Sequence, residues 1–366
     1  MNDIEWMQQA MNEAAKGGWT VHPNPMVGAI IVRHDQELGR GYHHKAGMPH
    51  AEIEALRQAQ ELGHDVRDAT IYVTLEPCNH YGRTPPCTEA LIKAGIKRCV
   101  IGSVDSDPRV RGAGIRRLQE AGIECVVGVC QNELLELNAA FFTRTRDNRP
   151  FITAKWAMTA DGHTATATGS SQWITGPEAR RDVHVERSKH DAIIAGTQTI
   201  LLDNPQLNVR LDGTWKQPIR IILDRTLRIP LSHNVFDTTN QKTILFTANH
   251  SAETAPWQDR GVCVEYAEET ENRLNLTQIL QTLAQKYTIT TLYCEGGAAL
   301  HGALLDQHLI DQVHIYMAPK LTGGLHARGC IAGTGIDKMS DAAQFSWNEI
   351  IRLGSDIRLS GRLRWS

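Results

Sequence analysis

The sequence has no long apolar run: nothing in its 366 residues approaches the roughly 18 consecutive apolar residues of a membrane-spanning helix. Its first residues, MNDIEWMQQAMNEAAKGGW, have neither the basic start nor the apolar core of an export signal. We therefore expect a cytoplasmic protein without a membrane partner. Its eight cysteines should then remain reduced, because disulfides persist mainly in oxidising compartments.

A block of basic residues is also absent. The formal net charge is −3, and charged residues make up 22% of the chain. Proteins that bind nucleic acid usually present a basic face, so this composition disfavours a nucleic-acid partner. A small anionic ligand needs only a few local cations, which the composition allows.

The glycine fingerprint G-x-G-x-x-G of Rossmann dinucleotide sites is missing too, so a bound dinucleotide would need a different anchor. One candidate is Glu295-Gly296-Gly297, which follows the strand-like TLYC and precedes an apolar helical segment. Glycines at such a junction let backbone N–H groups approach a pyrophosphate at the helix N-terminus. A simple turn would show the same residues, so the pattern alone leaves both interpretations open.

The chain length predicts two domains, and both read as α/β. In the first 145 residues, strand patterns such as Val27–Val32 alternate with helical ones such as Ala51–Leu62. This alternation predicts a mostly parallel sheet covered on both faces. The polar segment Thr143–Pro150 has the composition of a linker. We therefore place the domains at residues 1–145 and 148–366.

Residues with metal-binding chemistry gather in the first domain. His50-Ala51-Glu52 opens a helical segment, and Cys78 and Cys87 follow a strand-like segment. One imidazole and two thiolates supply three of the four ligands of tetrahedral zinc, and a catalytic zinc keeps its fourth position for water. Zinc lowers the pKa of that water, and Glu52 would pass its proton to a leaving amine. This pattern is typical of zinc-dependent nucleobase deaminases.

A structural zinc site is the alternative, because His80 could complete a four-ligand set in which Glu52 has no role. The gap between Cys78 and Cys87 is also longer than the two-residue gap of the deaminase signature. The intervening YGRTPP must therefore loop back if both thiols are to meet one metal.

The longer motifs resemble one enzyme family. HPNPMVGAIIV (His22–Val32), HAE and EPCNHYGRTPPC (Glu76–Cys87) are similar to the deaminase half of the bifunctional riboflavin-biosynthesis deaminase/reductase family, RibD. KWAMTADGHTA, SQWIT, GTQTILLDNPQLNVR and EGGAALHGALL are similar to its reductase half, in the expected order. The resemblance spans nearly the whole chain and makes the long cysteine spacing typical. It implies a cytidine-deaminase-like α/β/α sandwich followed by a dihydrofolate-reductase-like α/β domain.

The same resemblance implies two reactions and two cofactors. The first domain would hold one Zn²⁺ and deaminate 2,5-diamino-6-ribosylamino-4(3H)-pyrimidinone 5′-phosphate at ring C2. The second would use NADPH to reduce the ribosyl group of the product to ribityl. The partner would be this small phosphorylated pyrimidine, and we expect the protein to form a homo-oligomer.

Carried over position by position, the resemblance also implies site residues. NADPH would contact Ala157, Trp173, Thr199, Asp203 and Gly297. The substrate would contact Ser171, Arg187, Leu207, Arg210 and Glu295. Arg187 and Arg210 suit the 5′-phosphate because a guanidinium is a planar fork of donors, while Lys155 and Glu295 are both candidates for the reductase proton donor. In the first domain Asn24, between two prolines, would orient the pyrimidine, although an ordinary turn asparagine would look the same.

Two further functions are compatible with the zinc residues. A deaminase of RNA or tRNA bases would share His50, Glu52, Cys78 and Cys87, with the second half as a binding domain. The near-neutral charge and the lack of a basic, aromatic stripe disfavour it. A non-catalytic zinc scaffold would have no use for Glu52.

Overall fold

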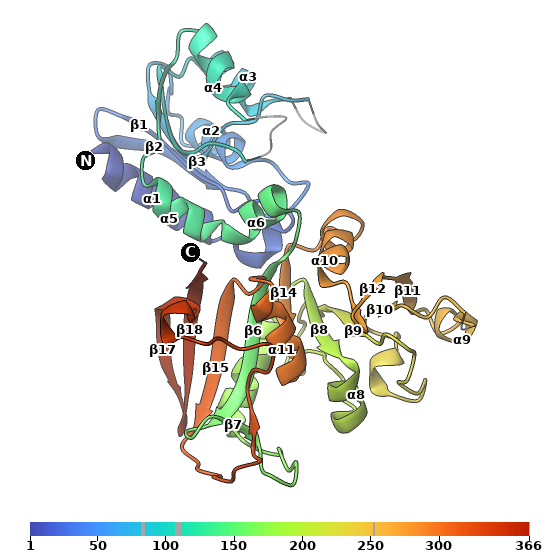
Figure 1. Cartoon of the computed structure of the whole chain (residues 1–366). Coiled ribbons are helices and arrows are strands. Elements are labelled where there is room, and N and C mark those ends of the chain that lie inside the picture. Colours follow the sequence, from blue (N-terminus) through green and yellow to red (C-terminus); the bar gives the residue numbers. More distant parts are fainter. Residues whose placement is uncertain (82–84, 107–110, 252, 366) are drawn as a thin grey trace. The chain divides into compact units, whose positions relative to one another are not determined.

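The computed structural model describes residues 1–81, 85–106, 111–251 and 253–365 (Figure 1). The chain divides into two compact units, Met1–Asn148 (unit 1) and Arg149–Ser366 (unit 2). The linker expected at residues 143–150 is mostly helical, because α6 (Ala139–Asp147) runs through it and buries Phe142 and Thr143. No helix of the described residues is long and apolar enough to cross a membrane.

Helices and strands alternate over most of unit 1. Its strands are β1 (Gly28–Arg33), β2 (Gln36–Tyr42), β3 (Thr70–Leu75), β4 (Arg98–Ser103) and β5 (Glu124–Val127). Its helical segments, besides α6, are α1 (Asp3–Ala15), the 3₁₀ turn η1 (Gly18–Val21), α2 (Ala51–Glu61), α3 (Cys87–Ala94), α4 (Ala113–Glu120) and α5 (Gln131–Leu137).

The strands of unit 1 form a mixed sheet in the order β2-β1-β3-β4-β5. Strands β3, β4 and β5 are parallel, as their connecting helices predict. The expectation of a mostly parallel sheet is wrong for β1, which is antiparallel to both β2 and β3. His34 and Asp35 cause the first of these pairings, because their positive φ values of 53° and 58° make a two-residue hairpin turn. Gly39 and Gly41 let β2 pass close under α2, where a β-carbon would come within 2.5 Å of the Ala55 backbone.

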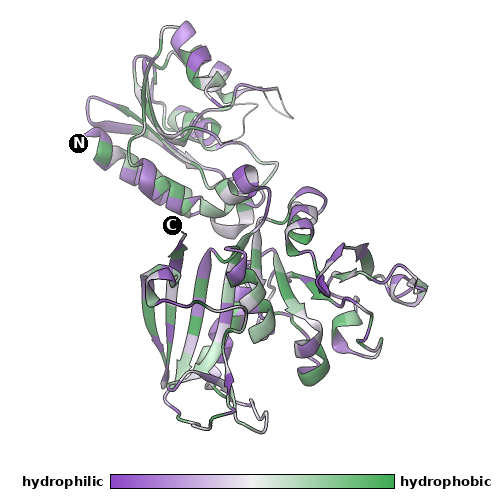
Figure 2. Ribbon diagram, viewed as in Figure 1, coloured by the Kyte–Doolittle hydropathy of each residue, from purple (hydrophilic) through white to green (hydrophobic). Residues whose placement is uncertain are grey.

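Helices cover both faces of this sheet, as predicted. On one face Met7 of α1 and Leu134 of α5 pack around Ile30 of β1. On the other face α2, α3 and α4 pack against Ile31, with Leu91 of α3 at the centre of the cluster. Neighbouring residues of β1 thus point to opposite faces, and both faces are buried. Figure 2 shows hydrophobic and hydrophilic residues mixed along the ribbons of both units.

Unit 2 contains a larger sheet with helices on both faces. Its main strands are β6 (Phe151–Thr159), β8 (Ala192–Gly196), β9 (Ile219–Leu223), β10 (Thr243–Thr247), β11 (Cys263–Tyr266), β14 (Thr291–Cys294), β15 (Gln312–Ala318), β17 (Gln344–Leu353) and β18 (Asp356–Arg364). Two small ribbons pair β7 (His163–Ala165) with β16 (Arg328–Gly329) and β12 (Glu269–Thr270) with β13 (Arg273–Leu274). Its helical segments are α7 (Pro177–Lys189), α8 (Thr197–Asp203), η2 (Asn234–Phe236), α9 (Ala255–Gln258), α10 (Leu276–Gln285), α11 (Ala298–Asp306) and η3 (Met339–Asp341).

The strand order is β11-β10-β9-β8-β14-β6-β15-β18-β17. All pairings from β11 to β15 are parallel, which confirms the predicted α/β domain, and only β18 and β17 pair antiparallel. The β17–β18 hairpin was not predicted from the sequence. Trp347 and Ile350 of β17 are 51% and 62% exposed, so this strand shows no clear buried face in its sequence.

The alternation of side chains along β6 and β14 determines which residues face the α7 side of the sheet. Ile152 and Ala154 of β6 and Cys294 of β14 belong to the core under α10 and α11. The opposite face packs against α7 and α8. Lys155 and Glu295, each next to one of these core residues, therefore point to the α7 side of the sheet.

Candidate active sites

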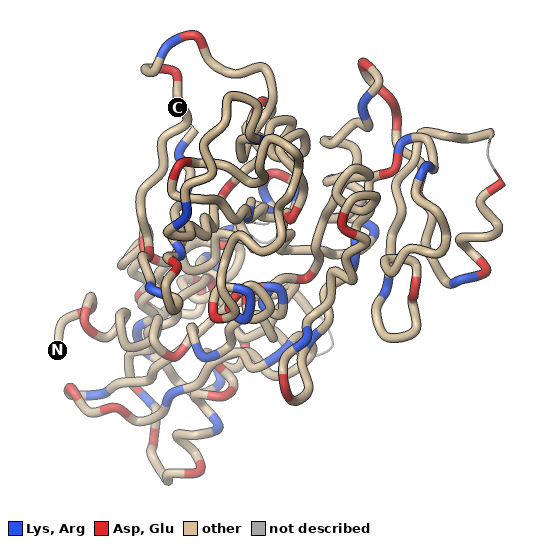
Figure 3. Tube along the Cα trace, turned by 90° about the horizontal axis from the view of Figure 1, so that it is seen from below, with Lys and Arg blue, Asp and Glu red and all other residues tan. Residues whose placement is uncertain are grey.

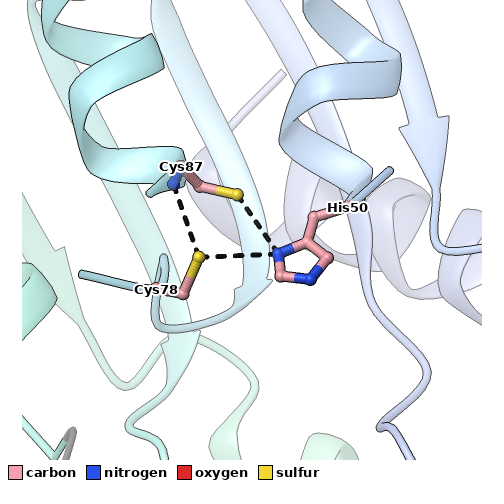
Figure 4. A group of neighbouring side chains, drawn as sticks. All are labelled: His50, Cys78 and Cys87. Carbon is pink, nitrogen blue, oxygen red and sulfur yellow. Dashed lines mark hydrogen bonds between the residues drawn. The ribbon is translucent and has the colours of Figure 1, made fainter. Parts of the chain in front are cut away.

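The candidate zinc ligands converge in unit 1 (Figure 4). His50 directly precedes α2, Cys87 is the first residue of α3, and Cys78 follows β3. The sulfur atoms of Cys78 and Cys87 lie 3.5 and 3.3 Å from Nδ1 of His50. All three donor atoms lie within 4.8 Å of one another. The predicted YGRTPP loop includes residues 82–84, which lie outside the described residues.

This geometry fits tetrahedral zinc. With zinc about 2.0–2.1 Å from nitrogen and about 2.3 Å from sulfur, tetrahedral angles place nitrogen and sulfur about 3.6 Å apart. His80, the fourth ligand of the structural-zinc alternative, is exposed and is not part of the cluster. Among the described residues three ligands therefore face the site, and a fourth zinc position remains for water.

Glu52, the second residue of α2, lies beside these ligands and is only 3% exposed. Burial raises the pKa of Glu52 to about 7, while the nearby His50 opposes this shift. The pKa of Cys78 is lowered to about 4, because Cys87 and His50 hydrogen-bond to its thiolate. A carboxyl group with a pKa near neutrality can both accept and return a proton, as deamination requires.

Asn24 reaches the same region through His43, a residue that the sequence analysis did not single out. Nε2 of His43 lies 3.0 Å from Nδ2 of Asn24, and its Nδ1 lies 3.0 Å from the carbonyl oxygen of Pro49. Because a carbonyl only accepts, Nδ1 carries the His43 proton and Nε2 accepts from Asn24. The His43 ring packs edge-on to His50, with 5.5 Å between centroids. The Asn24 amide is thus oriented close to the metal site.

Glu76, the acidic residue of the EPC motif, has a role that the sequence analysis also missed. Its buried carboxylate accepts hydrogen bonds of 2.9–3.3 Å from the backbone amides of Asp105, Gly112, Gly114 and Ile115. Glu76 therefore ties the N-terminus of α4 to the segment that carries Cys78. A β-carbon at Gly114 would come within 2.0 Å of the Pro77 carbonyl oxygen, so this contact requires glycine. An acidic residue directly before Pro-Cys was the available signal.

Unit 2 contains a cavity of 1610 Å³ around the carboxyl ends of β8, β9 and β14. The structure brings every residue predicted for the reductase site to its wall: Lys155, Ala157, Ser171, Trp173, Arg187, Thr199, Asp203, Leu207, Arg210, Glu295 and Gly297. The wall also carries other arginines, among them Arg180 and Arg225. Elsewhere, basic and acidic residues are interspersed along the trace (Figure 3). The cavity is therefore suited to anionic ligands.

Two of these residues, Trp173 and Leu207, differ strongly in their exposure. Trp173 is 64% exposed, and the guanidinium of Arg180 lies 4.6 Å from its ring centroid. Leu207 as a whole residue is only 2% exposed, and it belongs to the apolar core behind the cavity wall.

Glu295, Arg187 and Lys155 form a buried ion cluster in the cavity wall. Arg187 donates to Glu295 from Nε at 2.5 Å and from Nη2 at 2.9 Å, and Nζ of Lys155 lies 3.8 Å from the same carboxylate. Burial favours a raised pKa for Glu295, but Arg187 and Lys155 hold it at about 2. Burial lowers the pKa of Lys155, and Glu295 opposes that shift. Arg187, predicted to bind phosphate, is thus paired with Glu295.

Two helix N-termini meet at this cavity. Gly196 precedes α8 and Gly297 precedes α11, and the strands that lead to them, β8 and β14, are hydrogen-bonded parallel neighbours. A β-carbon at Gly297 would lie 3.5 Å from Oγ1 of Thr199, so a larger side chain would fill the space between the two helix starts. N–H groups and positive dipole ends suit a pyrophosphate at this place. The residues present therefore fit a dinucleotide.

Together the two sites define a bifunctional enzyme with a deaminase unit and a reductase unit. Residues 1–103 match the family described as the cytidine and deoxycytidylate deaminase zinc-binding region. Residues 150–359 match the family described as the RibD C-terminal domain. The chain belongs to the RibD family of riboflavin biosynthesis proteins.

Relatives cover the chain from end to end. It is 42% identical to riboflavin biosynthesis protein RibD of Aquifex aeolicus, over 97% of each chain. The solved structure of Acinetobacter baumannii RibD matches at a TM-score of 0.87 and 39% identity, over 99% of each chain. The diaminohydroxyphosphoribosylaminopyrimidine deaminase/5-amino-6-(5-phosphoribosylamino)uracil reductase of Thermotoga maritima matches at 0.83 and 34%, over 99% of each chain. The predicted family, fold class and enzyme classes are confirmed.

Proposed function

We propose that unit 1 deaminates 2,5-diamino-6-ribosylamino-4(3H)-pyrimidinone 5′-phosphate at ring C2, and that unit 2 reduces the ribosyl group of the product to ribityl. The name of the Thermotoga maritima relative gives corresponding pyrimidine phosphates as its substrates. The observation that carries the proposal is the meeting of three zinc-type ligands with the buried Glu52 in unit 1. Unit 2 adds a cavity of 1610 Å³, larger than the roughly 300–1,000 Å³ that one small ligand needs.

In unit 1, His50, Cys78 and Cys87 would hold zinc, which would supply a polarised water when bound. Glu52 takes a proton from this water and delivers it to the amino nitrogen at C2. The ring carbon gains the oxygen, and the amine leaves as ammonia. The amide of Asn24, oriented by its histidine partner, hydrogen-bonds the pyrimidine.

In unit 2, the cavity wall would hold NADPH, which would supply a hydride to C1′ of the ring-opened, imine-like sugar when bound. The imine nitrogen must also gain a proton. Glu295 is an ionised carboxylate paired with Arg187, so it has no proton to give. Lys155, buried beside it, is the proton donor, and Glu295 holds the ammonium in place. This pairing favours Lys155 over Glu295 as the proton donor.

Zinc and NADPH are the cofactors of these two reactions. The starts of α8 and α11 hold the NADPH pyrophosphate, with Gly297 and Thr199 at the point of contact. Ala157, Trp173 and Asp203 complete the cofactor wall. Ser171, Arg187, Leu207, Arg210 and Glu295 form the substrate wall.

The test incubates the protein with the diaminopyrimidine phosphate, with and without NADPH, and follows ammonia release and NADPH absorbance. Ammonia should appear without NADPH, and NADPH should be consumed only after deamination. In Lys155→Met ammonia release should stay normal, while NADPH consumption falls by about 10²-fold or more, the scale of a positioned proton donor. Unchanged NADPH consumption would remove Lys155 from this role, and absence of ammonia from zinc-loaded wild type would contradict the deaminase assignment.

The proposal also includes residues 1–145 as the deaminase domain and 148–366 as the reductase domain. We further propose that the protein is cytoplasmic, forms a homo-oligomer and binds small molecules. The net charge of −3 without a basic block disfavours a nucleic-acid partner. Light scattering after size exclusion tests the oligomer. Tight RNA binding at low salt would favour the base-deaminase alternative instead.

A further inference from the structure

The substrate side of the reductase cavity has fewer available donors than its arginines suggest. Arg187 donates from Nε and Nη2 to Glu295 and from Nη1 to the Asn208 carbonyl oxygen at 2.9 Å. These bonds use three of the five N–H groups of a guanidinium, and the side chain is only 11% exposed. Arg187 can therefore give a phosphate at most two further hydrogen bonds.

His184 lies one helical turn before Arg187 on α7 and lines the same cavity. Its Nδ1 lies 3.1 Å from the Asn208 carbonyl oxygen and 3.2 Å from the backbone nitrogen of Arg210. A carbonyl only accepts and a backbone N–H only donates, so Nδ1 of a neutral ring serves one of the two. Asn208 already accepts from Arg187.

The Arg210 N–H decides between the two ring forms. Its hydrogen bond to Nδ1 of His184 is the only one found for this amide among the described residues. The arrangement that satisfies every group has an unprotonated Nδ1 that accepts from Arg210. The ring proton then sits on Nε2, whose N–H has no protein partner in the described parts of the chain.

The surroundings keep this ring neutral. Burial, together with Arg187 and Arg210, lowers the pKa of His184 to about 4, and Glu295 opposes that shift. At neutral pH His184 therefore offers one accepting nitrogen to the loop, and its donating N–H belongs to a ring that lines the cavity.

We propose that His184 is a substrate-binding residue of the reductase site: its Nδ1 fixes the backbone of Arg210, and its Nε2–H donates to the substrate phosphate that Arg210 pairs with. This proposal rests on the proposed reductase function. A phosphate oxygen accepts from both groups, and the two donors are coupled because one positions the other.

Removal of the phosphate from the ligand isolates this contact. Reductase kinetics are measured with the deaminated substrate and with the same compound lacking its 5′-phosphate, at saturating NADPH. In His184→Ala, kcat/KM for the phosphorylated substrate should fall by about tenfold or more, the scale of a lost hydrogen bond to a charged group. For the dephosphorylated compound it should change by less than about twofold, and the Kd of NADPH should be unchanged.

Two conservative variants separate the two nitrogens. Asparagine can reproduce Nδ1 as an acceptor, and glutamine can reproduce Nε2 as a donor. We expect His184→Gln to recover part of the phosphate-dependent loss, whereas His184→Asn should recover only the positioning of Arg210. Arg210→Ala is the matched comparison and should show the same selective loss.

Different outcomes contradict different statements. Equal losses for both compounds in His184→Ala, with a selective loss in Arg210→Ala, would reject His184 as a phosphate contact and leave the reductase function intact. An unchanged kcat/KM for both compounds in His184→Ala would also reject His184 as a phosphate contact. If wild type reduces both compounds equally well, the phosphate site itself is wrong, and this proposal fails with it.

Discussion

The deaminase pocket gathers its chemistry from a short stretch of chain, whereas the reductase cavity gathers it from most of unit 2. His50, Cys78 and Cys87 sit at the ends of successive elements, and their donor atoms lie within 4.8 Å of one another. The wall of the reductase cavity runs from Lys155 on β6 to Gly333 after β16. The first site is a fixed cluster of a few ligands, and the second is a broad surface on which many residues share the binding contacts.

This difference predicts different responses to mutation. Loss of one metal ligand removes the zinc site, because three protein ligands are already the minimum for a catalytic zinc. Loss of one reductase contact leaves the rest of a 1610 Å³ cavity in place. Single substitutions should therefore act all-or-none at the metal ligands of unit 1 and gradually at the binding contacts of unit 2.

The largest effect is expected for Cys87→Ser. A neutral hydroxyl is a poor substitute for a zinc thiolate, so the variant should lose its zinc and its deamination. Reduction of a substrate that is already deaminated should continue, because unit 2 has its own site. Elemental analysis measures the zinc, and one full equivalent in the purified variant would exclude Cys87 as a ligand.

Glu52→Gln should have the next largest effect. Because the glutamine cannot carry the proton, deamination should fall by about 10²-fold or more. Zinc content should stay at one per chain, which distinguishes this variant from Cys87→Ser. Deamination at the wild-type rate would mean that Glu52 is only a buried residue of the α2 N-terminus.

The two sites also differ in how far they could be predicted from the sequence. Histidine, cysteine and glutamate at close spacing have few other uses, so His50, Glu52, Cys78 and Cys87 were predictable from their chemistry alone. In unit 2, residues such as Asp203 resemble ordinary surface residues, and only the family resemblance singled them out. The structure then brought them to one cavity.

What the sequence could not show depends on contacts between distant backbone groups. Glu76 acts through amides about forty positions further on, such as Gly114, and His184 acts through the Arg210 amide. No local pattern marks such partners. The β17–β18 hairpin was missed for a related reason, since an exposed edge strand lacks the apolar alternation that identifies a buried one.

A graded effect is expected for Gly297→Val. Gly297 has an extended backbone with φ −78° and ψ 177°, which valine adopts without strain, so the fold should persist. The added side chain would occupy the space beside Thr199 in which we place the pyrophosphate. NADPH affinity should fall by at least about tenfold, or about 1.4 kcal/mol, with zinc and ammonia release unchanged. Fluorescence titration measures the affinity, and Gly297→Ala should lie between wild type and valine.

The smallest effect on activity is expected when unit 1 is removed. The core clusters of unit 2 draw all their residues from beyond Arg149. Residues 148–366 should therefore fold alone, bind NADPH and reduce the deaminated substrate within a few-fold of the full chain.

The start of the fragment matters, because Arg149 donates to both oxygens of Asp311 at 2.7 and 2.8 Å, and Asp311 also accepts from the amide of Ile152. A fragment that begins at residue 151 should therefore lose about 1.5–3 kcal/mol of unfolding free energy, or about 3–12 °C in Tm, while its NADPH affinity stays the same. Thermal unfolding of the two fragments side by side tests this. If fragment 148–366 is insoluble while the full chain is stable, the two sites differ in chemistry but do not belong to independently folding domains.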